Sequence, residues 1–129
     1  MGDTKLPRPT DAELAILRVL WKRGPSTVRQ VHDELSQRQR VGYTTVLKLL
    51  QIMMEKGLVT RDESARTHVY NARLAEDQTQ RQLVHDLLDR AFAGSARKLI
   101  MQALAIKKAS PEELTAIREL LDELEREQS

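Results

Sequence analysis

The amino-acid sequence predicts a mainly α-helical fold that carries one small antiparallel β hairpin near its middle. Three helix-like segments come first, and two short strand-like stretches follow Gly57. From Glu76 onward, helical periodicity returns and continues almost to the last residue. A composition of 40% hydrophobic and 31% charged residues is typical of a globular protein.

The first helix is expected to begin after Thr10 and to end at Arg23. Thr10 and Glu13 have the spacing of a capping box, in which each side chain bonds to the backbone N–H of the other residue. Gly24 and Pro25 then stop the helix. Its apolar residues recur at helical spacing: Leu14, Leu17, Leu20 and Trp21.

Two further helices follow in close succession. The second is expected to start at Ser26 or Thr27, because Thr27 and Gln30 form another capping box. The third is expected over residues 43–56, and Gly57 suits the position just after its last turn. The apolar positions are Val28, Val31 and Leu35 in the second helix, and Val46, Leu49, Leu50 and Met53 in the third.

After Gly57 the hydrophobic pattern changes from helical to β periodicity. Residues 58–61 and 67–71 predict two strands joined by a polar hairpin turn. Three helices followed by a hairpin make a winged helix-turn-helix, which we expect over residues 10–75. Residues 1–9 contain two prolines and no periodicity, so they are expected to form a flexible N-terminal arm.

Residues 76–129 predict a region of three helices, of which Gly94 ends the first and Ser110-Pro111 opens the last. Their apolar residues recur at helical spacing, but so small a region buries too little surface to be stable alone. We therefore predict that this region forms a homodimer. The residues expected at the dimer interface are Leu83, Leu87, Leu99, Ile100, Ala103, Leu104, Leu114, Ile117, Leu121 and Leu124.

Charge is divided unevenly along the chain. Residues 1–75 contain 13 Lys or Arg and 8 Asp or Glu, a net charge of +5, whereas residues 76–129 contain 8 and 11, a net charge of −3. This asymmetry is expected if only the first part of the chain meets a polyanion. Chance scatter of charged residues is the alternative interpretation.

The third helix turns its apolar side inward and leaves polar residues on its outer face. A helix in the major groove of DNA presents its N-terminal residues to base edges, which threonine and lysine side chains can contact. Arginines near this helix and the hairpin can neutralise phosphates. Asp62 and Glu63 weaken the hairpin as a phosphate-binding site, and Arg66 is the best phosphate-binding candidate there. Taken alone, each of these residues also fits an ordinary solvated surface. The residues expected to bind double-stranded operator DNA are Tyr43, Thr44, Thr45, Lys48, Gln51, Arg38, Arg40, Arg61 and Arg66.

The sequence gives no convincing sign of an enzyme, a metalloprotein or a membrane protein. It has no cysteine, its three histidines fall in different predicted elements, and no glycine-rich phosphate loop is present. We therefore expect no catalytic residue, no metal site and no cofactor. No hydrophobic run is long enough to span a membrane and no secretory signal precedes the first helix, so a cytoplasmic protein is expected.

Four segments of the chain carry a family resemblance. They are PTDAEL at 9–14 with VLW at 19–21, YTTVL at 43–47, EKGLV at 55–59, and HVY at 68–70. Together they resemble the BlaI/MecI/CopY family of penicillinase-type repressors, over about residues 6–127. The resemblance implies a dimeric transcriptional repressor whose winged helix binds a palindromic operator and whose C-terminal helices interlock.

The chain departs from that family's pattern in two respects. Copper-responsive members end in a cysteine cluster, and this chain contains no cysteine, so metal sensing of that kind is excluded. The β-lactam-responsive members are inactivated by cleavage of an Asn-Phe bond, and Gln102-Ala103 stands at that place here. The resemblance implies Gln102-Ala103 as a candidate cleavage bond and a membrane sensor-protease as a candidate partner, and it leaves the inducing signal open.

One alternative function remains open. A winged helix can serve as a protein-interaction module without binding DNA, and Ile52 and Met54 near the outer face of the third helix favour that function. The basic first part of the chain and the polar face with Thr44, Thr45 and Lys48 favour DNA. We therefore predict an operator-binding repressor.

Overall fold

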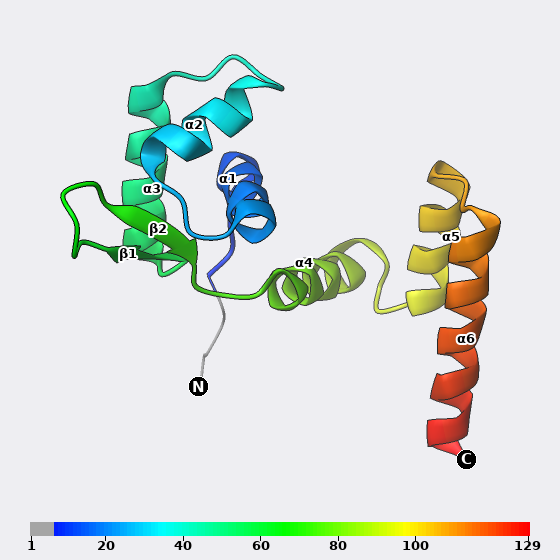
Figure 1. The fold of residues 1–129 in the computed structure, drawn as a ribbon. Coiled ribbons are helices and arrows are strands. Elements are labelled where there is room, and N and C mark those ends of the chain that lie inside the picture. The colour runs from blue at the N-terminus through cyan, green and yellow to red at the C-terminus, as the bar shows by residue number, and fades with distance from the viewer. Residues whose placement is uncertain (1–6) are drawn as a thin grey trace. The chain divides into compact units, whose positions relative to one another are not determined.

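A computed structural model describes residues 7–129, so residues 1–6 of the expected N-terminal arm lie outside the described residues. In the described part, helices and one hairpin follow each other in the order that the sequence predicts (Figure 1). The elements are α1 (Asp11–Arg23), α2 (Val28–Ser36), α3 (Tyr43–Lys56), β1 (Val59–Asp62), β2 (Val69–Ala72), α4 (Glu76–Ala91), α5 (Ala96–Ile106) and α6 (Pro111–Gln128). The mainly helical fold with a small antiparallel wing is thereby confirmed.

Both predicted capping boxes are present, and they explain where α1 and α2 begin. Glu13 N donates to Thr10 Oγ1 over 3.2 Å, and Thr10 N donates to Glu13 Oε1 over 2.9 Å. Thr27 and Gln30 repeat this exchange over 3.2 and 2.9 Å. These bonds satisfy backbone N–H groups that the first turn of a helix leaves without a partner.

Both strands of the hairpin begin later in the sequence than predicted. Leu58 N donates to Met53 O over 2.9 Å and so completes the end of α3 instead of starting β1. Gly57 makes this turn possible with a left-handed backbone at φ 81°. The antiparallel register of the hairpin pairs Val59 with Ala72, Thr60 with Asn71, Arg61 with Tyr70, and Asp62 with Val69.

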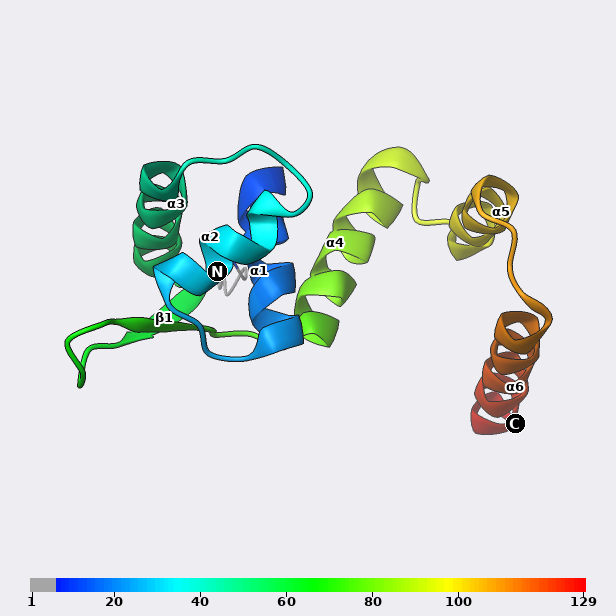
Figure 2. The ribbon, with the colours of Figure 1, turned by 45° about the horizontal axis from the view of Figure 1, so that its top comes forward.

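Ser26, one of the two expected starts of α2, belongs instead to the sheet. Its N–H donates to Tyr70 O over 2.9 Å and its carbonyl accepts from Tyr70 N over 2.7 Å. The Ser26 side chain is fully buried, and its hydroxyl donates to Gly24 O over 2.9 Å. The α1–α2 connection therefore adds a one-residue bridge beside β2, while the hairpin projects beyond the three helices (Figure 2).

One hydrophobic core joins the three helices to the base of the hairpin. The stripe predicted for α1 is partly wrong, because it omits Ile16, which is fully buried, and includes Leu14, which is only half-buried. The reason is that α1 packs against α2, α3 and β2 together and so buries a wider face than one stripe. The core residues are Ile16, Leu17, Val19, Leu20, Val28, Val31, Leu35, Val46, Leu50, Met53, Leu58, Val59 and Tyr70.

A nearly buried ion pair links the start of α1 to the end of α3. The Glu13 side chain is 3% exposed, and Lys56 Nζ donates to its Oε1 over 2.6 Å. Burial raises the pKa of Glu13, but the hydrogen bonds and charge of Lys56 and the hydrogen bonds of Thr10 lower it, and the pKa lies below its ordinary value. Glu13 is therefore both a helix cap and the partner of a distant lysine.

The chain divides into two compact units, of which the first ends at Val84 and the second spans His85–Ser129. The first unit extends beyond residue 75, where Thr79 of α4 is buried, and Trp21 Nε1 donates to Leu74 O over 3.0 Å just before α4. In the second unit the packing is different: neither α5 nor α6 contains a buried residue. The division of function at residue 75 stays a prediction.

We expect Lys56→Met to lower the free energy of unfolding at pH 7 by about 1–3 kcal/mol, because it leaves the buried Glu13 carboxylate unpaired. Lys56 lowers the pKa of Glu13, so its contribution is present above the unfolded carboxyl pKa of about 4.3 and is lost as the pH falls through the native pKa. The difference in the free energy of unfolding between wild type and Lys56→Met, the deficit of the variant, should therefore shrink as the pH falls from 7 to about 3.

Urea unfolding at several pH values measures this deficit. Lys22→Met is the matched control, since Lys22 is exposed on α1 and makes no ion pair within residues 7–129. A deficit that stays constant with pH, or that Lys22→Met reproduces, would contradict the role given to the Glu13–Lys56 pair.

Candidate nucleic-acid interface

The outer face of α3 is polar, exposed and unobstructed. Val46, Leu50 and Met53 are completely buried on the inner face, which fixes the rotation of the helix about its axis. The residues that this rotation brings together on the outer side, all exposed, are Thr44, Thr45, Lys48 and Gln51. Within residues 7–129 none of these side chains has a hydrogen bond or an ion pair, so each is available to a ligand.

Tyr43, the first residue of α3, lies against two side chains of α2. Its ring is 40% exposed, the guanidinium of Arg29 lies 5.0 Å from the ring centroid, and the ring of His32 meets it edge-on at 6.0 Å. Arg29 and His32 are three residues apart on α2 and therefore share a helix face. Sequence analysis missed Arg29; its spacing from His32 was the one available signal.

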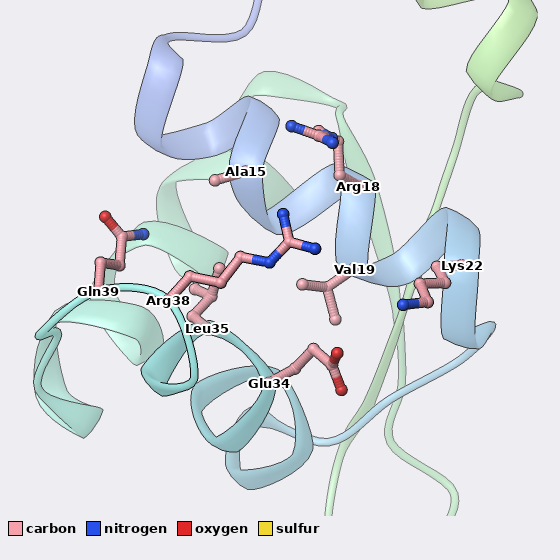
Figure 3. A pocket seen from close by; sticks show the side chains of 8 residues that line it. All are labelled: Ala15, Arg18, Val19, Lys22, Glu34, Leu35, Arg38 and Gln39. Carbon is pink, nitrogen blue, oxygen red and sulfur yellow. The ribbon is translucent and has the colours of Figure 1, made fainter.

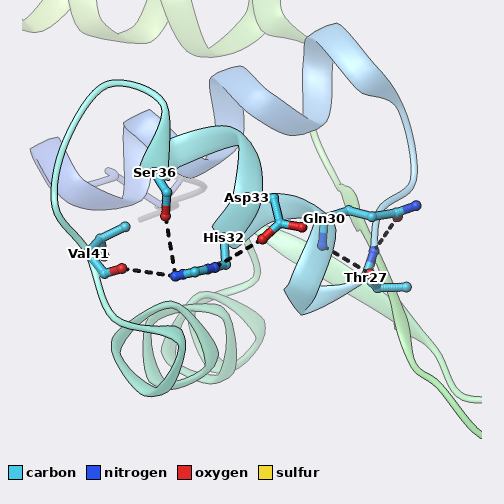
Figure 4. Close-up of polar contacts among 6 residues, drawn as sticks. All are labelled: Thr27, Gln30, His32, Asp33, Ser36 and Val41. Carbon is cyan, nitrogen blue, oxygen red and sulfur yellow. Dashed lines mark hydrogen bonds and ion pairs between the residues drawn. The ribbon is translucent and has the colours of Figure 1, made fainter.

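His32 fixes the turn between α2 and α3. Its Nε2 lies 3.0 Å from Val41 O, and because a carbonyl oxygen only accepts, Nε2 is the donor (Figure 4). Ser36 Oγ lies 3.3 Å from the same nitrogen, and Asp33 Oδ1 lies 3.3 Å from Nδ1. The sequence had shown His32 only as a poor metal ligand; the structure shows that it positions the residues that precede α3.

The first turns of α2, α3 and α5 carry no acidic residue, whereas those of α1, α4 and α6 do. Helix N-termini carry a partial positive charge that acidic side chains usually neutralise. At α2 and α3 that charge remains available, on the elements that carry Arg29 and Tyr43. The local field is therefore favourable to an anion.

The two arginines expected to bind phosphate from the hairpin differ in the structure. Arg61 is mostly buried beside Glu63, with Nε donating to Glu63 Oε2 over 2.6 Å, and hydrogen bonds to Tyr70 and then Glu63 raise its pKa. Its charge is therefore already neutralised. Arg66 is exposed near the hairpin tip and has no ion pair in the described part of the chain. Arg66 is the better phosphate contact of the two.

Arg38 and Arg40 follow α2, and they too have different surroundings. Arg38 extends over a cavity of about 160 Å³ between α1 and the end of α2, on the side where Arg18 also points (Figure 3). Arg40 is exposed in the turn before α3. Arg40 lies close to Tyr43 in the chain and has no other evident role. The expected DNA contact of Arg38 stays a prediction.

Residues 7–129 contain neither a metal-binding cluster nor a membrane-spanning helix. No group of three or more histidine, aspartate or glutamate side chains is arranged to bind a metal ion there. No helix in this range has the length and hydrophobicity to cross a membrane. The polar face of α3 and the α2–α3 turn are thus the candidate functional site.

Comparison with known proteins gives concordant results. Residues 9–123 match the model of a family described as penicillinase repressor. The chain is 36% identical over 122 residues to the transcriptional regulator BlaI of Mycobacterium tuberculosis, covering 94% of this chain and 88% of that protein. It is 26% identical over 119 residues to the penicillinase repressor of Bacillus licheniformis, covering 92% and 93%.

Two solved structures are similar to a little over half of the chain. One is the solution structure of Bacillus licheniformis BlaI, in its monomeric form in complex with the blaP half-operator, with a TM-score of 0.50 and 29% identity; the match covers 57% of this chain and 89% of that one. The other is the DNA binding domain of the repressor BlaI, with a TM-score of 0.50 and 28% identity, covering 57% and 90%.

We expect His32→Ala to lower the free energy of unfolding by about 0.5–1.5 kcal/mol, through loss of the hydrogen bond to Val41 O. Amide hydrogen exchange should accelerate over residues 37–42 more than in the core of α1, because the turn loses its attachment. Asp33→Ala is the control, since it leaves the bond to Val41 intact. Equal exchange in the turn of wild type and His32→Ala would refute this role for His32.

Proposed function

Because the chain belongs to the penicillinase-repressor family, we propose that it is a transcriptional repressor that binds a palindromic DNA operator as a homodimer. The two relatives are regulators of transcription and not enzymes. The observation that carries the proposal is the exposed polar face of α3, with Thr44, Thr45 and Lys48 free of partners within residues 7–129. A cytoplasmic location follows from operator binding.

In this proposal α3 is the recognition helix, and its neighbours bind phosphates. The Lys48 ammonium donates to guanine O6 or N7, and Thr44 and Thr45 offer hydroxyl and methyl groups to base edges. Gln51, one turn further along, extends the same face. Tyr43, Arg40 and Arg66 contact the backbone and set the docking register. Arg61 and Arg38 contribute less, since one is paired and the other extends over the α1–α2 cavity.

The homodimer is proposed from the packing of the second unit. Ile100 is 48% exposed, Leu104 40%, Leu121 51% and Leu124 44% in the single chain, which leaves large side chains of two amphipathic helices in water. A second copy covers them most simply, since identical faces are self-complementary about a two-fold axis. The ten residues predicted from the sequence for the dimer interface are the ones proposed here.

We also propose that repression ends by proteolysis within the dimerisation region, by a membrane sensor-protease. Gln102 and Ala103 are exposed in the single chain, but they lie inside α5, where Ala103 O accepts from Lys107 N over 3.3 Å, and Ala103 is one of the residues proposed at the dimer interface. A protease binds an extended peptide, so cleavage at Gln102-Ala103 requires α5 to unwind locally first. In the single chain no residue of α5 is buried, so unwinding costs little there, whereas in the proposed dimer it also requires the interface to open around α5.

The alternative function, a protein-interaction module, has one observation in its favour. Ile52 is 39% exposed beside the polar face of α3, and Met54 is half-buried. A protein-binding surface of this kind is usually built on a larger apolar patch. The polar residues of α3 outnumber this single exposed side chain, so DNA is the better-supported partner.

Lys48→Ala should weaken binding to the operator by about 1–3 kcal/mol and weaken binding to random DNA much less, because a base contact is lost only on the specific site. Fluorescence anisotropy with the chain's own upstream DNA and with a scrambled duplex measures both. Glu55→Ala is a control on the same helix. Equal losses on the two duplexes would make Lys48 a phosphate contact, and no binding by the wild-type chain would refute the proposed function.

Removing α5 and α6 should leave the winged helix folded but reduce operator affinity by roughly 10²–10⁴, because two linked modules bind with avidity that one lacks. Residues 1–97 are compared with the full chain by ultracentrifugation, circular dichroism and anisotropy. In the full chain, Leu121→Glu should act in the same direction, whereas Glu123→Gln on the same helix should not. A truncated chain that stays dimeric and binds equally well would exclude this mechanism.

A further inference from the structure

The contact between α2 and the start of α3 contains an arginine that the proposed recognition of the operator by α3 does not involve. Arg29 is exposed, and its guanidinium lies over the Tyr43 ring at 5.0 Å from the centroid. Within residues 7–129 it makes no ion pair; the nearest acid on its helix face, Asp33, lies instead beside His32 Nδ1 at 3.3 Å. A planar cation is thus oriented by an aromatic ring while its charge stays uncompensated.

We propose that Arg29 and Tyr43 together form a phosphodiester-binding site for the DNA backbone at the entrance to α3, with His32 as a positioning residue. The inference rests on the proposed operator binding and adds to it a contact from α2. Arg29 donates to the phosphate oxygens, the Tyr43 ring keeps the guanidinium in place, and the Tyr43 hydroxyl is a second donor. His32 fixes the turn that carries Tyr43.

The chemistry of the pair selects a phosphate. The guanidinium carbon of Arg29 lies 5.0 Å from the centroid of the Tyr43 ring, and a guanidinium held over a ring keeps N–H groups that can donate to two oxygens of one anion. A phosphodiester offers two such oxygens and one negative charge. No acidic residue is present in the first turn of α2 or α3 to repel it.

The position of the pair distinguishes a phosphate from a base. Arg29 belongs to α2, while the base-reading residues proposed above all belong to α3, the helix that enters the groove. In helix-turn-helix proteins the helix preceding the recognition helix crosses the backbone, where phosphates lie. A phosphate contact sets the register of Thr44 and Thr45 on the bases without itself depending on sequence.

Binding of the full chain to operator and to scrambled duplex, measured by anisotropy over a series of KCl concentrations, tests the proposal. Arg29→Ala should lower the affinity for both duplexes by similar factors. It should also reduce the steepness with which the log of the binding constant falls against the log of the KCl concentration, by about 0.9 per site. Arg18→Ala removes the same charge from α1 and should change neither. Thermal unfolding of each variant confirms that it is folded.

A second comparison tests the role of the ring. Tyr43→Phe keeps the aromatic ring and should retain most of the salt dependence of wild-type binding. Tyr43→Ala should lose much of the affinity that Arg29→Ala loses. The variant with both alanines should lose less affinity than the two single losses added together. His32→Gln, which keeps a donor toward Val41, should bind more like wild type than His32→Ala.

The outcomes separate this inference from the proposed function. If wild type binds the operator and Arg29→Ala is indistinguishable from Arg18→Ala, the phosphate site is refuted and operator binding stands. A loss confined to the operator would make Arg29 a base contact, which also overturns the proposal. Additive losses in Arg29→Ala and Tyr43→Ala would refute the ring's role. If wild type binds neither duplex, the proposed function itself fails.

Discussion

The buried carboxylate of Glu13 is the constraint on which the arrangement of the first unit depends. It accepts from Thr10 N at the start of α1 and from Lys56 Nζ at the end of α3, and Lys56 also donates to Arg8 O over 3.2 Å. A carboxylate that is 3% exposed is costly to bury unless all its bonds are made together. Correct packing of α3 on α1 is therefore coupled to the cap of α1, and a misplaced α3 would leave a buried charge.

With α3 fixed at its end by Lys56, the remaining freedom lies at its beginning, and His32 removes it. The bond from His32 Nε2 to Val41 O attaches the turn before Tyr43 to α2, and the Tyr43 ring packs against the same helix. A helix fixed at both ends holds its backbone, and with it the directions in which its outer side chains leave the helix, in one orientation. Less conformational entropy is then lost on binding, which is the physical advantage of a preorganised interface.

The sequence predicted what depends on near neighbours and missed what depends on distant ones. Capping boxes, the glycine after α3 and the polar outer face of α3 are visible at spacings of a few residues. The Glu13–Lys56 pair joins residues 43 positions apart, and no local pattern indicates it. The same limit explains why the sheet role of Ser26 and the Arg29–Tyr43 contact were not predicted. The exposure of Thr44, Thr45 and Lys48 was predictable because a buried helix face defines the exposed one.

The two units differ in what stabilises them. The first unit has its own core, so the backbone that carries the side chains proposed to contact DNA does not depend on packing by α5 and α6. In α5 and α6 no residue is buried, so the single chain gives these helices little hydrophobic stabilisation. In the proposed dimer, a signal that acts on α5 or α6 would change the number of winged helices held together without changing the structure of either one. Regulation of this kind needs no conformational change in the winged helix.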